Sequence, residues 1–207
     1  MRVRALFKAA IAASGLSIMA ATPALAQVGL MGGLNLGTVS VSGETEDQEF
    51  KFQPGFVGGV FFGVPFMETP KIALRIEVML SQKGVRIGAA GLTESVRIHE
   101  LEIPVLLTFL AKRGTRMNIR ALGGLAFAGI LDNSSSIDGN AVADAELNDS
   151  EVGLKGGVLV ERGKFFYGAS YTLGLTNLLA DTSGSPVDAV KTRTLSVVVG
   201  WNLKKAK

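Results

Sequence analysis

Hydrophobic residues alternate with polar or small residues over eight separate segments of the chain. In the segment 71–84, Leu74 and Ile76 share one face of an extended chain, whereas Arg75 and Glu77 fall on the other. A period of two indicates strands with one apolar side and one polar side. The predicted strands cover residues 28–37, 56–64, 71–84, 101–109, 117–131, 152–160, 165–175 and 193–203.

The connections between these strands alternate in length. Short connections lie at 65–70, 111–116 and 161–164, and long ones lie at 38–54, 84–95, 132–151 and 176–192. Strands near 9–11 residues cross a bilayer at a tilt, and short turns opposite long loops are typical of outer-membrane barrels. The pattern therefore predicts an all-β fold, an eight-stranded antiparallel up-and-down transmembrane β-barrel with its apolar face toward lipid.

The first residues of the chain have the features of an export signal. Three basic residues precede an apolar stretch at 9–21, and Ala24-Leu25-Ala26 then forms an A-x-A cleavage pattern. We expect cleavage between Ala26 and Gln27, so that 1–26 is a signal peptide and 27–207 is the barrel domain. Together with the strand pattern, this indicates the outer membrane of a Gram-negative-type envelope.

Composition narrows the classes of function. The leader contains three of the 21 Lys and Arg residues, so the remaining 18 balance 18 Asp and Glu residues, and nucleic-acid binding has no support. The absence of Cys excludes disulfide scaffolds and thiol catalysis, and a single His disfavours His-rich metal sites. We expect no cofactor and no metal.

Charge also differs between the two kinds of connection. The long loop 132–151 carries six carboxylates and no base, whereas the short turns at 111–116 and 161–164 are basic. We therefore expect the long loops to be extracellular and the short turns to be periplasmic. Carboxylates could hold calcium, but the loop lacks the EF-hand pattern, which favours a solvated loop over a cation site.

Five charged residues fall on the face that would line the lumen. The interior of an eight-stranded barrel is just wide enough to be filled by side chains, and an unpaired buried charge is costly. A paired network that plugs the barrel is therefore favoured over a gated ion path or a small polar pocket. The candidate network comprises Arg75, Glu77, Glu102, Arg120 and Lys155.

Two further positions, Pro104 and His99, lead to specific predictions. Pro104 lies inside a predicted strand of a closed barrel, which predicts a bulge or a missing ladder bond there. His99-Glu100 could support acid–base chemistry in a lipid-modifying barrel enzyme, which needs a serine such as Ser81 or Ser95 within reach of the His. No G-x-S-x-G elbow occurs. We assign no catalytic residue and interpret His99 as an interfacial polar residue.

Several segments resemble the PorT-like outer-membrane β-barrel family. They are "VGLMGGLNLG" (28–37), "PGFVGGVFFGVPF" (54–66), "IEVMLSQKG" (76–84), "LEIPVLL" (101–107) and "YTLGLTNL" (171–178). The resemblance implies an eight-stranded up-and-down barrel in the outer membrane and no defined catalytic activity. The chain departs from the usual pattern by ending in "WNLKKAK" rather than in an aromatic residue, and Trp201 stands a few positions earlier.

The expected function is non-enzymatic: envelope integrity, adhesion, or a role in envelope or secretion assembly. A narrow channel or transport-related barrel is the alternative, and a lipid-modifying enzyme or a soluble lipocalin-like carrier is less favoured. Such a carrier normally has a Gly-x-Trp near its first strand, whereas the sole Trp here is Trp201. The expected partners are outer-membrane lipid, lipopolysaccharide and the barrel-assembly machinery; an external ligand is not identifiable from the sequence.

Overall fold

The computed structural model describes residues 27–43, 49–65, 71–89, 92–137, 140–142, 147–178 and 187–204. The predicted leader, 1–26, with Ala26 of the cleavage site, lies outside these residues, whereas Gln27 is the first residue of a strand. Within the described residues, no helix has the length and apolar character needed to span a membrane.

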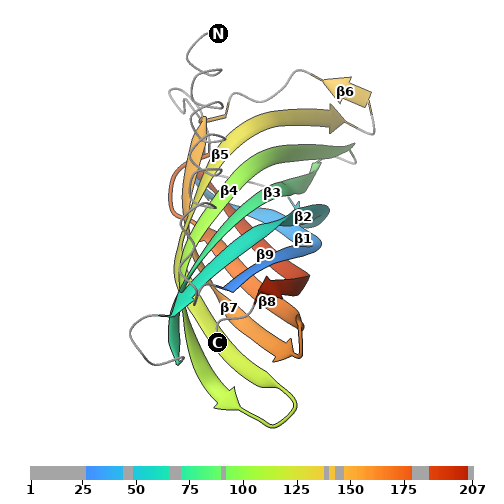
Figure 1. Ribbon diagram of the computed structural model, residues 1–207. Coiled ribbons are helices and arrows are strands. Elements are labelled where there is room, and N and C mark those ends of the chain that lie inside the picture. Colours follow the sequence, from blue (N-terminus) through green and yellow to red (C-terminus); the bar gives the residue numbers. More distant parts are fainter. Residues whose placement is uncertain are drawn as a thin grey trace, which may run out of the picture.

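Eight strands form one closed antiparallel barrel (Figure 1). Neighbouring strands in the sequence pair with each other, β1 pairs with β9, and β4 pairs with β5, so the sheet closes on itself. The short β6 (Asn140–Val142) pairs with the end of β5, its one partner among the described residues. The barrel strands are β1 (Gln27–Gly43), β2 (Glu49–Pro65), β3 (Ile72–Ala89), β4 (Leu92–Arg113), β5 (Asn118–Ile137), β7 (Ser150–Arg162), β8 (Phe165–Gly174) and β9 (Val187–Lys204). The predicted fold class is confirmed.

The strands extend well past the predicted ranges at one end of the barrel. β3 and β4 continue until only residues 90–91 separate them, so the expectation of a long loop at 84–95 is wrong. β5 likewise runs to Ile137, inside the predicted loop 132–151. In "VRIGA" (85–89) the alternation continues in the opposite sense, with the apolar Val85 buried on the interior face and Arg86 exposed, so a rule that places apolar residues toward lipid did not predict this extension.

The barrel has two distinct ends. We call the end with the connections after β2, β4 and β7 the turn end, and β1 begins and β9 finishes there. The other end, with the connections after β1, β3, β5 and β8, is the loop end. The hairpin of β4 and β5 reaches furthest at the turn end in Figure 1, and it closes with Gly114 N–H donating to the Met117 carbonyl at 3.0 Å.

Pro104 interrupts the ladder without a bulge at its own position. β3 and β4 pair at Ile76↔Val105 and again at Met79↔Glu102, with no paired positions between them and no change of register. On its other side, Pro104 pairs with Ala126 of β5 in register. Because proline has no N–H to donate, the gap faces β3. The missing ladder bond is the structural solution here.

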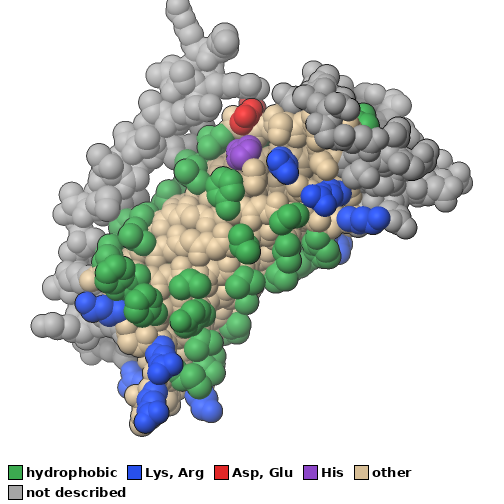
Figure 2. All heavy atoms as spheres, turned by 90° about the vertical axis from the view of Figure 1, so that its right-hand side faces the viewer, with side chains coloured by type: hydrophobic (Ala, Val, Ile, Leu, Met, Phe, Trp, Pro, Cys, Tyr) green, Lys and Arg blue, Asp and Glu red, His purple; other side chains and the backbone are tan. Residues whose placement is uncertain are grey.

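The outer face of the wall is apolar across its middle. Every barrel strand exposes large hydrophobic residues there, among them Leu34, Leu107, Tyr167, Val197 and Trp201. Figure 2 shows hydrophobic side chains over the middle of this face, with Lys and Arg gathered toward both ends. A contiguous apolar band of this size on a barrel exterior is the surface that lipid covers.

Two glycines make room for aromatic rings inside the barrel. A Cβ placed on Gly29 would collide with the ring of Phe61, and one placed on Gly200 would collide with the ring of Phe166. These rings are 0% and 1% exposed, so they have no other space to occupy. The interior is therefore packed by side chains rather than left open.

Candidate functional site: the barrel interior

An apolar layer fills the barrel interior at the level of Phe61 and Phe166. These rings meet edge to face, with centroids 5.2 Å apart and planes at 87°. The layer has members from all eight barrel strands, so it bridges the whole cross-section. It consists of Met31, Val57, Phe61, Met79, Leu106, Leu122, Leu159, Phe166 and Val198.

Arg75 joins this apolar layer to the charged groups beside it. Its guanidinium carbon lies 3.7 Å from the centroid of Phe61 and 4.9 Å from that of Phe166, a cation–π arrangement. Its Nε donates to Glu77 Oε1 at 2.7 Å, and an Nη atom lies 3.3 Å from Met31 Sδ. Arg75 thus has a carboxylate partner for its charge and also packs against the aromatic rings of the apolar layer.

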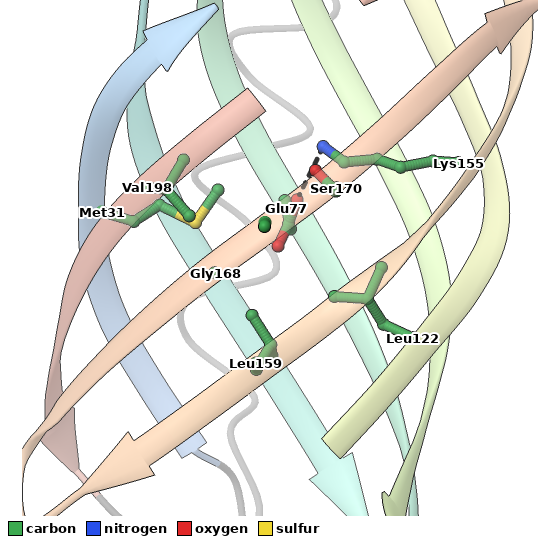
Figure 3. Close-up of a pocket in the computed structure, with 9 residues that line it drawn as sticks. Met31, Glu77, Leu122, Lys155, Leu159, Gly168, Ser170 and Val198 are labelled. Carbon is green, nitrogen blue, oxygen red and sulfur yellow. Dashed lines mark hydrogen bonds and ion pairs between the residues drawn. The ribbon is translucent and has the colours of Figure 1, made fainter. Parts of the chain in front are cut away.

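A chain of alternating charges continues from Glu77 toward the loop end. Lys155 Nζ donates to Glu77 Oε2 at 3.3 Å and to Glu102 Oε1 at 3.4 Å (Figure 3 shows Glu77 and Lys155). Glu102 Oε2 in turn lies 3.3 Å from Lys83 Nζ. All of these side chains are buried, so each charge depends on its neighbours rather than on water.

Lys83 is the most surrounded cation of the network. Its Nζ lies 2.8 Å from Glu100 Oε2 and 4.0 Å from Glu151 Oε2, in addition to Glu102. Glu151 also accepts a hydrogen bond from the Thr192 hydroxyl. The connected network therefore consists of Arg75, Glu77, Lys83, Glu100, Glu102, Glu151 and Lys155. Three cations face four carboxylates, so the cations do not fully balance the formal charge of the network.

Four of the five sequence-derived lumen residues, Arg75, Glu77, Glu102 and Lys155, are joined by these ion pairs, and Arg120 pairs with Glu161. Arg120 Nε lies 3.3 Å from Glu161 Oε1 near the turn end, where both side chains are about 15% exposed. The pair lies near the turn end because β5 places Arg120 close to its first residue, Asn118. The partly buried position of Arg120 is consistent with the predicted lumen face.

Sequence reasoning missed Lys83, Glu100 and Glu151 as members of the network. Lys83 shares the face of Arg75 and Glu77, so period two alone could have found it. Glu100 precedes the predicted strand 101–109, and Glu151 was assigned to the acidic loop. The assignment of Glu151 to a solvated loop is wrong: it is 4% exposed inside β7. Asp138, Asp144 and Glu146 lie outside the described residues.

Beyond the charges, polar side chains link β1, β3 and β9 across the interior. Asn35 Nδ2 donates to Ser81 Oγ at 2.9 Å, and Ser196 Oγ donates to Asn35 Oδ1 at 2.7 Å. A small cavity remains beside Glu77 and Lys155, with room for about one water molecule. Figure 3 shows its lining side chains converging from opposite walls.

His99 lies on the other face of the wall. Its ring centroid is 6.3 Å from that of Phe56, and its Nε2 is 3.3 Å from Gln82 Nε2. Ser81 points inward to Asn35, so it cannot meet His99, and Ser95 lies four residues away, about 13 Å along the same strand. Within the described residues, no group of three or more His, Asp or Glu side chains could hold a metal ion.

The family model for the outer membrane protein beta-barrel domain matches residues 20–180. The chain belongs to this family. As an outer membrane protein beta-barrel, it lies in the outer membrane, and the apolar band around the closed barrel is its lipid-facing surface. Comparison with curated proteins gives no match.

Solved structures of outer-membrane barrels are similar in outline to this outer membrane protein beta-barrel. The attachment invasion locus protein Ail of Yersinia pestis is 12% identical, with a TM-score of 0.47, covering 86% of this chain and 99% of that one. OprG of Pseudomonas aeruginosa is 11% identical, with a TM-score of 0.48 and coverages of 86% and 95%. Neisserial surface protein A is 14% identical, with a TM-score of 0.49 and coverages of 85% and 97%.

Proposed function

We propose that this protein is a non-enzymatic, non-conducting barrel that supports the envelope or presents its loops for adhesion or assembly. The observation that carries the proposal is the filled interior. An apolar layer and a paired ion network lie one above the other, and the cavity between them is about the size of one water molecule. This supports the proposal, because a hydrated ion would have to displace the side chains of both layers to pass.

Planar-bilayer recording of the purified full-length protein tests this function. We expect no stepwise conductance from the wild type, because Phe61, Phe166 and the ion network fill the cross-section. The variant Phe61→Ala, which removes the ring under Arg75, serves as a comparison for a loosened interior. Reproducible steps from the wild type would contradict the proposal and favour the narrow channel or transport-related barrel.

The absence of enzymatic activity is part of the same proposal. His99 faces the lipid side of the wall, where its described contacts are Phe56 and Gln82. A nucleophile needs a base within about 3 Å, and neither Ser81 nor Ser95 is so placed. A soluble lipocalin-like carrier is set aside, because the apolar face of this barrel points outward.

We further propose that the loop end is extracellular and the turn end periplasmic. Outer-membrane barrels have short periplasmic turns and longer extracellular loops, and both ends of the barrel chain, β1 and β9, meet at the turn end. Outer-membrane lipid and lipopolysaccharide would then surround the apolar band, and the barrel-assembly machinery would insert it. We also propose the finer PorT-like assignment, which the motifs "SQKG" and "LEIPVLL" support.

A further inference from the structure

Five cations project from the outer face of the wall just beyond the apolar band, toward the loop end. All five are exposed, and those on β3, β4 and β9 occupy outward positions in the alternation of their strands. Lys51 lies beyond a register shift in β2 and is the cross-strand partner of Arg86. They come from β2, β3, β4 and β9, which with β1 are consecutive around the barrel. We call this set the cationic arc: Lys51, Arg86, Arg97, Lys191 and Arg193.

The arc lies at the depth where lipid headgroups begin. On β9, Arg193 lies two residues before the outward Leu195, about 7 Å along the strand toward the loop end. On β4, Arg97 stands four residues from the outward Leu101, with the polar His99 between them. Basic side chains at this boundary reach headgroups while their stems cover apolar surface.

The arc occupies only one side of the barrel. On β5, β7 and β8, the described outward positions at the same level are Asp132, Ser134, Ser150 and the exposed Leu175 just after β8, none of them a cation. A ring of cations that merely anchored the barrel in any bilayer would run around the whole circumference. The one-sided arrangement indicates a directed binding surface.

Like charges stand next to one another within the arc. Lys51 and Arg86 are direct cross-strand partners, and Arg97 is two residues from Ser95, the partner of Arg86. Directly opposed like charges destabilise a strand pair. Arg86 donates a hydrogen bond to the side-chain oxygen of Gln53, and Arg193 donates one to Ser40 Oγ at 3.0 Å, both of them neutral oxygens. An anion beside these guanidinium groups would be attracted by the neighbouring positive charges.

We propose that the cationic arc binds the phosphate groups of lipid A, the phosphorylated glycolipid of the outer leaflet. The inference deepens the proposed contact with lipopolysaccharide and rests on the proposed orientation, with the loop end outside. Guanidinium groups bind phosphate through paired N–H donors, and three of the five cations are arginines. Lipid A presents its phosphates just above the acyl chains, at the depth of the arc.

The test uses the full-length protein folded in detergent and native mass spectrometry with two probes, diphosphoryl lipid A and the same lipid with its phosphates removed. The triple variant Arg86→Gln, Arg97→Gln, Arg193→Gln removes three charges from the arc. The matched control, Arg113→Gln, Arg116→Gln, Arg162→Gln, removes three exposed charges from the turn end. We expect about tenfold weaker binding of diphosphoryl lipid A by the arc variant and wild-type binding by the control.

Three results would overturn the inference. They are equal losses in both variants, no loss in the arc variant, and equal wild-type binding of the two lipids. Heat-modifiable mobility on gels verifies that each variant is folded before binding is measured. Since the binding assay does not involve conductance, failure of this inference is distinguishable from failure of the non-conducting barrel.

Discussion

At the scale of single residues, the interior depends on Lys83. This one ammonium group faces Glu100, Glu102 and Glu151, and all four side chains are at most 4% exposed. Removing one partner of a buried ion pair leaves an uncompensated charge, which costs far more than the pair contributes. We therefore expect the packing of the barrel interior to depend on the ion network.

Replacing Lys83 by Gln should lower the free energy of unfolding by about 3 kcal/mol, because three buried carboxylates then face one another. Urea unfolding in lipid vesicles, followed by the fluorescence of Trp201, measures this change. The exposed Lys112→Gln should shift stability by less than about 0.5 kcal/mol. The double variant Lys83→Gln, Glu100→Gln should recover part of the loss. If Lys83→Gln behaves like Lys112→Gln, the network does not stabilise the barrel.

A second residue-level prediction concerns the glycine under Phe166. Gly200→Val should prevent folding, because its Cβ would occupy the position of the buried Phe166 ring. Gly156→Val is the matched control: Gly156 is exposed on the outer face, and its nearest neighbour to a new Cβ is 3.9 Å away. Heat-modifiable gel mobility distinguishes the two. Normal folding of Gly200→Val would show that the interior is looser than described.

At the scale of the elements, hydrophobic alternation predicted the part of each strand that crosses the membrane. The ranges 28–37, 56–64, 101–109, 152–160 and 193–203 lie wholly inside observed strands. Apolar residues outward, the pattern used to predict the strands, did not find the extensions of β3 and β4, because their apolar Val85 and Ile98 are buried on the inward face. The extension of β5, "DNSSSI", is polar and carries no apolar alternation. These extensions are held by pairing with neighbouring strands. The sequence of one segment does not reveal such pairing.

The same limit applies to the site. Period two placed Arg75, Glu77, Glu102 and Lys155 on the interior face, and the ion pairs join them. The period-two pattern did not identify Glu100 and Glu151, because each lies just outside a segment of apolar alternation. The apolar layer around Phe61 and Phe166 was also not foreseen, as a lumen face was expected to be chiefly polar.

The orientation of the elements leads to a prediction for intact cells. A protease recognition sequence inserted after position 143, in the connection between β5 and β7, should be cleaved by protease added outside. The same sequence inserted at Gly163, in the turn between β7 and β8, should be cleaved only after the outer membrane is permeabilised. Immunoblots of the fragments report both. The reverse pattern would invert the proposed topology.

At the scale of the whole molecule, the barrel has its apolar surface outside and its charges inside. The outward residues of β9 are between 39% and 54% exposed from Leu195 to Leu203, whereas Ser196, Val198 and Asn202 are at most 9% exposed. The stability of such a molecule depends on lipid around the band, since water there would meet a large continuous apolar surface.

Spin-label accessibility along β9 tests this arrangement most directly. The chain has no native Cys, so single-cysteine variants at positions 195 to 201 can each carry one nitroxide label in reconstituted bilayers. Molecular oxygen concentrates in the lipid phase, and its collisions with the label report exposure to lipid. We predict high oxygen accessibility at Leu195, Val197, Val199 and Trp201, and low accessibility at Ser196, Val198 and Gly200. Alternation in the opposite phase, or none at all, would contradict the account.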